Sequence, residues 1–242
     1  MVQKIGYNNQ TLKLFNIKNM AAVLPCPYPA VEQIGSLGYG ETKSGFAETF
    51  IVPQWPQHRP LVFLDIETTG GSVGGKRGSR ITEIGALRVE NGEIVQTMSQ
   101  LLNPEQSVPA FITRLTGISN DMVARAPLFC EVADELETIL DGAIFIAHHV
   151  QFDYGFIKQE FARINRQFNM NRLCSVRLDR RLYPEQRRHS LDYVIERLGI
   201  KVEHRHRAYD DAEVLYQLFA VEFANDPKRL LHAMQKLLVH CR

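Results

Sequence analysis

The chain has 242 residues, of which 45% are hydrophobic and 23% charged, and its formal net charge is +1. This size fits one ordinary globular domain with a sizeable core and further residues at one end, and the charge balance alone implies neither a nucleic-acid nor a membrane partner. The four cysteines are scattered and form no CxxC pair, which argues against a disulfide scaffold and a zinc site. No apolar run approaches the roughly 20 residues of a membrane span, which argues against a transmembrane protein.

Residues 1–57 differ in composition from the rest of the chain. They contain the turn-rich stretches "PCPYP", "GSLGYGETKSG" and "PQWPQHRP" and show no sustained helical or strand period. We interpret them as an N-terminal extension of unknown role that ends in a proline-rich linker. The first residues, "MVQKIGYNNQ", lack a signal-peptide pattern, so we expect a cytoplasmic protein.

Residues 58–226 have the pattern of a single α/β domain. The run "LVFLDI" predicts a strand buried on both faces, and "RITEIGALRVENGEIVQTMSQLL" predicts a hairpin around an Asn-Gly turn. Further strands are expected at 143–147 and from 172, and helices at 128–140, 152–165, after the strand that begins at 172, at 190–200 with Ser190 as N-cap, and at 208–224. A hairpin followed by alternating strands and helices indicates a mixed sheet with helices on its faces.

Residues 227–242 contain a short amphipathic helix. Its apolar residues fall on one helical face, which favours packing on the domain over a partner-binding helix. These residues are Leu230, Leu231, Met234, Leu237 and Leu238.

The first predicted strand ends in "LDIETTG". Asp65 and Glu67 lie two residues apart, so both side chains project from the same face of the strand. Two interpretations are open from these residues alone. The carboxylates meet solvent or cap the following turn, or they are hard oxygen ligands for Mg²⁺ or Mn²⁺.

A third carboxylate follows the strand "AIFIA", in "HHVQFDYGFI". Asp153 stands at the start of a helix, where Asp is also common as a cap or first-turn residue. Phe152, Phe156 and Ile157 have the pattern of core residues, and Phe156 is the candidate for stacking on a base.

The segment "EHRHRAYDDAE" contains two adjacent aspartates. On a helix that starts near Ala208, Asp211 shares a face with Leu215, Leu218 and Phe219, whereas Asp210 projects toward a more polar side. An unneutralised carboxylate on the inward face is costly, so Asp211 should meet a cation or a hydrogen-bond donor. Helical geometry does not choose between His204 and His206.

The three segments "DIETTG", "HHVQFDYGFI" and "HRAYDDAE", in this order, resemble the exonuclease motifs of the DEDD superfamily. More narrowly they resemble its histidine branch, which includes the proofreading epsilon subunit of bacterial DNA polymerase III. The resemblance covers about Pro60 to Ala224 and includes "LLNPEQSVPAFITRLTGISNDMV". The third motif, His-x-Ala-x-x-Asp, matches His206, Ala208 and Asp211, and leaves His204 and Asp210 out.

The resemblance implies an RNase H-like fold, with a mixed five-stranded sheet flanked by helices, and a two-metal 3′–5′ exonuclease. Two divalent ions, Mg²⁺ or Mn²⁺, would be held by Asp65, Glu67, Asp153 and Asp211. His206 would be the general base, since an unperturbed histidine accepts a proton near neutral pH. Thr68 and Thr69 would face the terminal nucleotide.

Two features depart from the family pattern. The family usually has Asn where this chain has His149, and the loop "GGSVGGKRGSR" at 70–80 is unusually rich in glycine and basic residues. Its Lys76, Arg77 and Arg80 either contact phosphate or are simply solvated. A basic cluster later in the chain is open to the same two interpretations, a solvated face or a polyanion-binding edge. It comprises Arg172, Arg177, Arg180, Arg181, Arg187, Arg188 and His189.

The leading hypothesis is therefore a metal-dependent exonuclease that acts on the 3′ ends of single-stranded DNA in proofreading or repair. One alternative is an exoribonuclease on the same scaffold, because no motif reports on the sugar 2′ position. Another alternative is a polymerase accessory protein that binds nucleic acid but has no catalytic activity. The presence of all five expected catalytic residues argues against it. Association with a DNA polymerase subunit is an open expectation, and no membrane partner is expected.

Overall fold

The computed structural model describes residues 59–73, 78–202 and 205–241. The predicted extension at 1–57 and the centre of the glycine-rich loop lie outside the described residues. Among the described residues, no helix is long and apolar enough to cross a bilayer.

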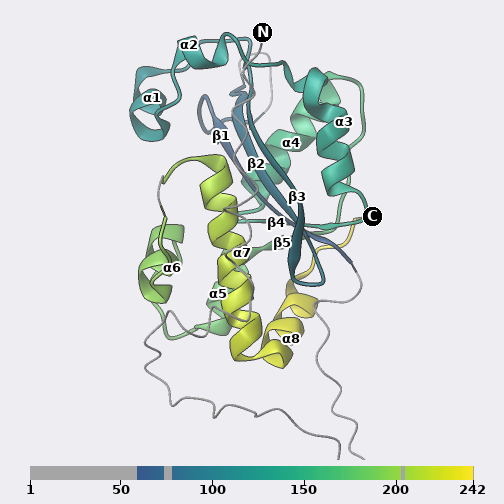
Figure 1. Ribbon diagram of the computed structural model, residues 1–242, viewed down its shortest axis with the longest axis vertical. Coiled ribbons are helices and arrows are strands. Elements are labelled where there is room, and N and C mark those ends of the chain that lie inside the picture. The colour runs from purple at the N-terminus through teal and green to yellow at the C-terminus, as the bar shows by residue number, and fades with distance from the viewer. Residues whose placement is uncertain (1–58, 74–77, 203–204, 242) are drawn as a thin grey trace, which may run out of the picture. The chain divides into compact units, whose positions relative to one another are not determined.

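A five-stranded mixed sheet forms the centre of the fold, in the order β3-β2-β1-β4-β5 (Figure 1). Strand β1 (Leu61–Thr68) pairs antiparallel with β2 (Ile81–Glu90) and parallel with β4 (Ile144–Ala147). Strand β3 (Glu93–Leu101) completes a hairpin with β2, and β5 (Arg172–Cys174) runs parallel to β4. The mixed five-stranded sheet agrees with the predicted fold class.

The hairpin closes through the two residues predicted from the sequence. Asn91 and Gly92 both have positive φ, 53° and 85°. A two-residue turn with positive φ at both positions twists in the same sense as the flanking strands, which explains why Asn-Gly favours it.

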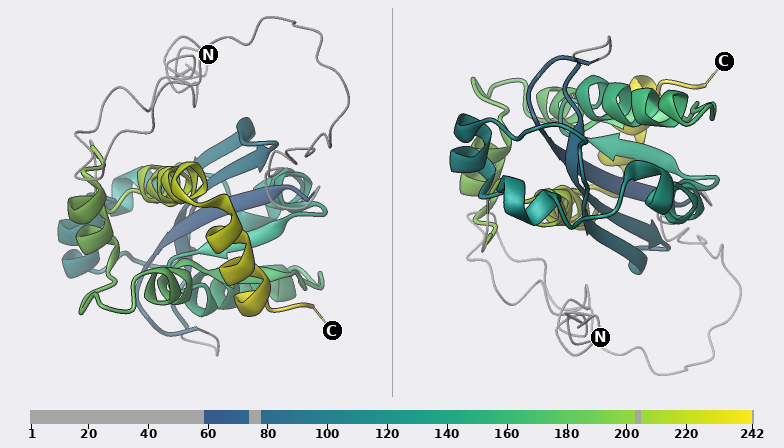
Figure 2. Two further views of the ribbon diagram at one scale, coloured as in Figure 1. Left: turned by 90° about the horizontal axis from the view of Figure 1, so that it is seen from below. Right: turned by 90° about the horizontal axis from the view of Figure 1, so that it is seen from above.

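Helices cover both faces of the sheet (Figure 2). On one face, α3 (Phe129–Leu140) and α4 (Gln151–Arg163) pack on Val62, Leu64 and Ile66 of β1. On the other face, Leu61 and Phe63 share a hydrophobic core with residues of four helices. These helices are α5 (Ser175–Leu182), α6 (Leu191–Leu198), α7 (Ala208–Asn225) and α8 (Pro227–Leu237). Strand β1 is therefore buried on both sides, as its continuous apolar run predicts.

Two local predictions about the later helices are confirmed. The Ser190 hydroxyl accepts the Tyr193 backbone N–H at 3.4 Å and so caps α6. Helix α8 buries Leu230 and Met234 in the core on the α7 side of the sheet, which agrees with packing on the domain.

Two short helices were not predicted. They are α1 (Ala110–Thr116) and α2 (Asn120–Val123), and they lie near the end of the sheet at which α7 begins (Figure 1). At seven and four residues they are too short to show a helical period in the sequence.

Candidate active site

Strand β1 presents Asp65 and Glu67 on the face of the sheet that α7 covers. Side chains alternate along a strand, so these two residues share the orientation of Leu61 and Phe63, whose partners are the helices of that face. Both carboxylates are partly buried. The same strand thus supplies core residues from its first half and acidic residues from its second half.

Helix α7 starts very close to β2. A Cβ atom on Gly85 would lie 2.1 Å from the carbonyl carbon of Ala208 and 2.2 Å from the backbone nitrogen of Tyr209. Gly85 is also the register partner of Asp65 on the neighbouring strand. Because Gly85 has no side chain, the first turn of α7 can lie directly over the strand beside Asp65.

Glu83 fixes the same turn from β2. Its carboxylate is 1% exposed, accepts the backbone N–H of Ala208 at 3.1 Å, and receives the Arg207 Nε–H, with 3.1 Å from Nε to each of its oxygens. Helix α7 has no side-chain cap of its own, so this carboxylate takes over that role. The sequence interpretation missed Glu83; the available signal was an acidic residue inside an otherwise apolar strand.

The opening turn of α7 delivers Asp211 and places His206 just before it. Asp211 is 5% exposed and belongs to the buried face of the helix, as the helical spacing predicts. His206 adopts a left-handed backbone conformation with φ of 60°. Donor atoms of Glu67, His206 and Asp211 all lie within 4.8 Å of one another. The structure therefore brings together two of the predicted carboxylates and the predicted base.

Asp153 approaches from the first turn of α4. Its side chain is 2% exposed, and its Oδ2 atom is buried without any hydrogen-bond partner among the described residues. The preceding loop contains His149 with φ of 62°. Histidine tolerates this left-handed conformation better than most residues do, so His149 fits the backbone of this loop.

The four carboxyl groups repel one another in a poorly solvated site. Burial holds the pKa of Asp65 well above its ordinary range, and the charges of Asp153, Asp211 and Glu67 raise it further. Burial likewise raises the pKa of Glu67 and that of Asp153 to about 8 each. Such a group either keeps protons or binds cations.

Arg205 brings a positive charge into contact with this group of carboxylates. Its guanidinium pairs with Asp211 and also donates to Asp192 at 2.7 Å and 2.8 Å. This hydrogen bond opposes the rise that burial imposes on the pKa of Asp211. One arginine does not balance four carboxylates, so the donor set suits additional divalent cations, and the unpartnered Asp153 oxygen is a natural ligand for one.

The predicted substrate-binding residues are largely enclosed. The Thr68 hydroxyl donates to the Gly70 carbonyl at 2.8 Å, and the Thr69 hydroxyl accepts from the Arg80 backbone at 3.0 Å. Both threonines are less than a tenth exposed, and Phe156 is 1% exposed within the core.

Phe156 therefore has the core role that its pattern suggests and presents no face to a base. Phe152, one turn earlier on α4, is 38% exposed and lies next to Asp153 in the chain. Its ring centroid is 4.8 Å from that of Phe156, so the core ring supports an exposed one.

Comparisons with known proteins match the segment that builds this site. The family model described as Exonuclease (RNase_T) matches residues 62–219. The chain is 42% identical over 160 residues to the 3′-5′ exonuclease DinG of Bacillus subtilis and 37% identical over 159 residues to the PolC-type DNA polymerase III of Caldanaerobacter subterraneus. Each alignment covers 66% of this chain but only 17% and 11% of the relative, so the chain spans a small part of these longer proteins.

Solved structures share the fold. Exonuclease X in complex with 5′ overhanging duplex DNA has a TM-score of 0.57 at 23% identity, over 72% of this chain and 98% of that one. The nuclease domain of 3′hExo, a DEDDh family member bound to rAMP, has a TM-score of 0.59 at 18% identity, over 71% and 94%. At these identities the likeness concerns the arrangement of the sheet and helices.

Proposed function

The chain belongs to the Exonuclease (RNase_T) family, and from this premise we propose that it removes nucleotides from the 3′ ends of single-stranded DNA by hydrolysis. The observation that carries the proposal is the gathering of acidic groups from β1, α4 and α7 at one end of the sheet, with raised pKa values and a buried Asp153 oxygen that has no partner among the described residues. A purely structural or adaptor protein would gain nothing from so costly an arrangement.

We propose that Asp65, Glu67, Asp153 and Asp211 hold two divalent cations, Mg²⁺ or Mn²⁺. Carboxylate oxygens are the ligands that these ions favour, and a divalent charge would relieve the mutual repulsion of the four groups. When bound, such a pair of ions lowers the pKa of the attacking water and stabilises the leaving 3′ oxygen.

His206 would act as the general base. It precedes α7, and one of its ring nitrogens lies within 4.8 Å of carboxylate oxygens of Glu67 and Asp211. A neutral imidazole can accept a proton from the attacking water, and general bases of this kind contribute roughly 10²–10⁴-fold to a rate. Glu83 and Gly85 would act indirectly, because they fix the start of the helix that carries Asp211.

The 3′-terminal nucleotide would lie over the turn at Thr68 and Thr69, with Phe152 rather than Phe156 available to its base. The exposed ring of Phe152 supports this exchange of roles. DNA is our first choice because the two relatives named above are a 3′-5′ exonuclease and a DNA polymerase. RNA is the second choice, because the structural neighbour 3′hExo is bound to rAMP.

A partnership with a DNA polymerase subunit and a cytoplasmic location complete the proposal. The first is supported by the likeness to a segment of a PolC-type polymerase. The second is supported by the free cysteines Cys130, Cys174 and Cys241, which suit a reducing compartment.

The test uses 5′-labelled single-stranded DNA and RNA of the same sequence, each with Mg²⁺, with Mn²⁺ and with chelator. We expect shortening from the 3′ end that requires metal and favours DNA. Asp65→Ala should abolish it, and Asp134→Ala, which removes an exposed carboxylate of α3, should not. Faster shortening of RNA than of DNA would reverse the substrate choice. Strands that stay intact under every condition would refute the proposed exonuclease activity.

A further inference from the structure

Five arginines on and after α5 have no described partner. Arg177, Arg180, Arg181, Arg187 and Arg188 are all exposed. Among the residues that the structure describes, none of the five takes part in an ion pair or a side-chain hydrogen bond. We call this group the arginine surface. Unpaired exposed arginines at this density are a feature of surfaces that meet polyanions.

The three arginines of α5 share one face of that helix. Arg177, Arg180 and Arg181 are spaced by three and four residues, and the opposite face buries Leu178 and Leu182 in the core. Their guanidinium groups therefore point away from the sheet as a set.

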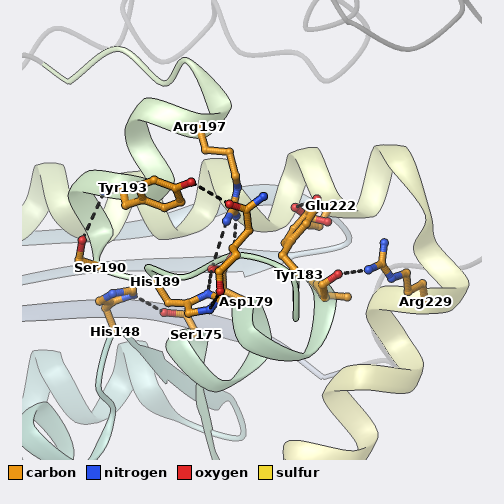
Figure 3. A network of polar contacts seen from close by, with 12 residues as sticks. His148, Ser175, Asp179, Tyr183, His189, Ser190, Tyr193, Arg197, Glu222 and Arg229 are labelled. Carbon is orange, nitrogen blue, oxygen red and sulfur yellow. Dashed lines mark hydrogen bonds and ion pairs between the residues drawn. The ribbon is translucent and has the colours of Figure 1, made fainter.

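The loop with Arg187 and Arg188 is held against α5 by a buried polar network (Figure 3). Asp179, which is 1% exposed, accepts from His189 Nδ1 at 2.6 Å and pairs with Arg197 of α6. His189 Nε2 also lies 3.1 Å from the Gln186 carbonyl oxygen. The two loop arginines thus directly precede an anchored residue, which keeps them beside α5.

The same network extends toward the candidate active site. His148 Nδ1 lies 2.9 Å from the Ser175 hydroxyl at the start of α5 (Figure 3). His148 follows β4, in the loop that leads to Asp153. Helix α5, which carries three of the five arginines, therefore begins beside the loop that leads to one of the predicted ligands.

Charge is strongly segregated in this nearly neutral chain. Residues 172–189 contain six arginines and two acidic residues, whereas residues 131–141 contain five acidic residues and no lysine or arginine. The acidic segment belongs largely to α3, which packs on the opposite face of the sheet from α5. A polyanion that reaches the site would meet attraction from the α5 side and repulsion from the α3 side.

We propose that the arginine surface binds the phosphate backbone of the nucleic acid strand on the 5′ side of the nucleotide being removed. This inference rests on the proposed function and extends the substrate contact from the terminal nucleotide to the strand behind it. Arginine suits the role because its planar guanidinium stays charged and matches phosphate geometry. Contacts of this kind hold a strand without reading its sequence.

The expected size of the effect follows from counterion release. Each phosphate contact on a single strand contributes about 0.7 to the slope of log K against log salt, which is about fivefold in affinity near 0.1 M salt. Replacing Arg187 and Arg188 should therefore weaken binding by roughly 25-fold and reduce the slope by about 1.4. Replacing all five arginines should remove up to about 3.5 from the slope.

The experiment measures binding and hydrolysis separately. Binding of a fluorescent single-stranded DNA of about 20 nucleotides, a length that reaches well beyond the site, is followed by anisotropy in chelator over a series of salt concentrations. Hydrolysis is measured on the same strand and on the p-nitrophenyl ester of thymidine 5′-monophosphate, which has no strand to bind. The variants are Arg187→Gln/Arg188→Gln and the fivefold Gln replacement. The control, Lys158→Gln/Lys236→Gln, removes two exposed positive charges elsewhere.

We expect the arginine variants to lose affinity and kcat/KM on the strand, to show a shallower salt dependence, and to keep wild-type kcat/KM on the ester. The control should match the wild type throughout, and thermal melting should show that every variant folds. If the arginine variants keep the wild-type salt slope and strand affinity, the arginine surface does not bind the strand, and an acidic protein would be its candidate partner. A wild-type chain that hydrolyses neither substrate would instead overturn the proposed function, while the anisotropy would still decide the surface.

Discussion

The metal-free protein should lose stability as the pH rises from about 6.5 to 8, which is the reverse of ordinary acid denaturation. Burial raises the pKa of Glu67 and that of Asp153 from near 4 to about 8. In this interval the folded chain therefore holds protons that the unfolded chain has released. Stability falls with pH wherever the folded state binds more protons, so the sign of the slope is negative.

The magnitude follows from the same two groups. A carboxyl group with a folded pKa near 8 changes the free energy of unfolding by roughly 1 to 2 kcal/mol across this interval. Two such groups give up to about 3 kcal/mol, which is roughly 6 to 12 °C in Tm for a chain of this size. His148 does not mask the effect. Burial lowers its pKa to about 4, so it is neutral in the folded chain over this interval. The proton that the unfolded chain releases above pH 6.5 offsets less than about 1 kcal/mol.

Thermal melting in chelator at several pH values measures this slope. Added Mg²⁺ should raise Tm and reverse the trend, since binding at about 100 times Kd stabilises by about 2.7 kcal/mol and protons compete with the ion at low pH. Glu67→Gln should make the metal-free protein more stable at pH 8, whereas Glu135→Gln on the exposed face of α3 should change nothing. A metal-free Tm that is flat or rises between these pH values would refute the picture of a repelling, proton-holding carboxyl cluster.

Three further changes probe single contacts. Gly85→Ala forces a methyl group into the backbone of Ala208. We therefore expect the free energy of unfolding, measured with denaturant, to fall by more than about 2 kcal/mol and activity to be lost. A stable, active variant would contradict the close approach of α7 to β2. Arg205→Gln frees Asp211 for metal and should tighten Mg²⁺ binding several-fold in calorimetry, and weaker binding would mean that Arg205 supports the metal site. His206→Ala should slow hydrolysis by about 10²–10⁴-fold while DNA and Mg²⁺ affinity stay intact. A parallel loss of metal affinity would identify His206 as a ligand instead of a base.

The parts of this structure that were predictable depend on local sequence. The Asn-Gly turn closes the hairpin because both residues tolerate positive φ, and Ser190 caps α6 because its hydroxyl reaches a nearby backbone N–H. The choice of Asp211 over Asp210 needs only the helical period. Each of these features is decided within about ten residues of chain.

The parts that were missed depend on contacts between distant residues. Glu83 and Ala208 are 125 residues apart, and nothing in either segment shows that a strand carboxylate will cap a helix on another element. The pairing of Arg205 with Asp211 is close in sequence, but it requires the loop before α7 to turn back on the helix. Phe152 and Phe156 have the same apolar character, and only the packing of α4 decides which ring is exposed.

The proposed metal site would need two divalent ions rather than one to balance its charge. Four carboxylates and Arg205, which is shared with Asp192, leave at least three negative charges uncompensated when every carboxyl group is ionised. A substrate phosphodiester adds a fourth negative charge, so one divalent ion would leave two in a site where burial already raises the carboxyl pKa values. Two divalent ions balance the set, and their binding should expel the protons that the metal-free site retains near neutral pH. Proton release on Mg²⁺ binding, measured by calorimetry in buffers of different ionisation enthalpy, should therefore be observed in the wild type and reduced in Glu67→Gln.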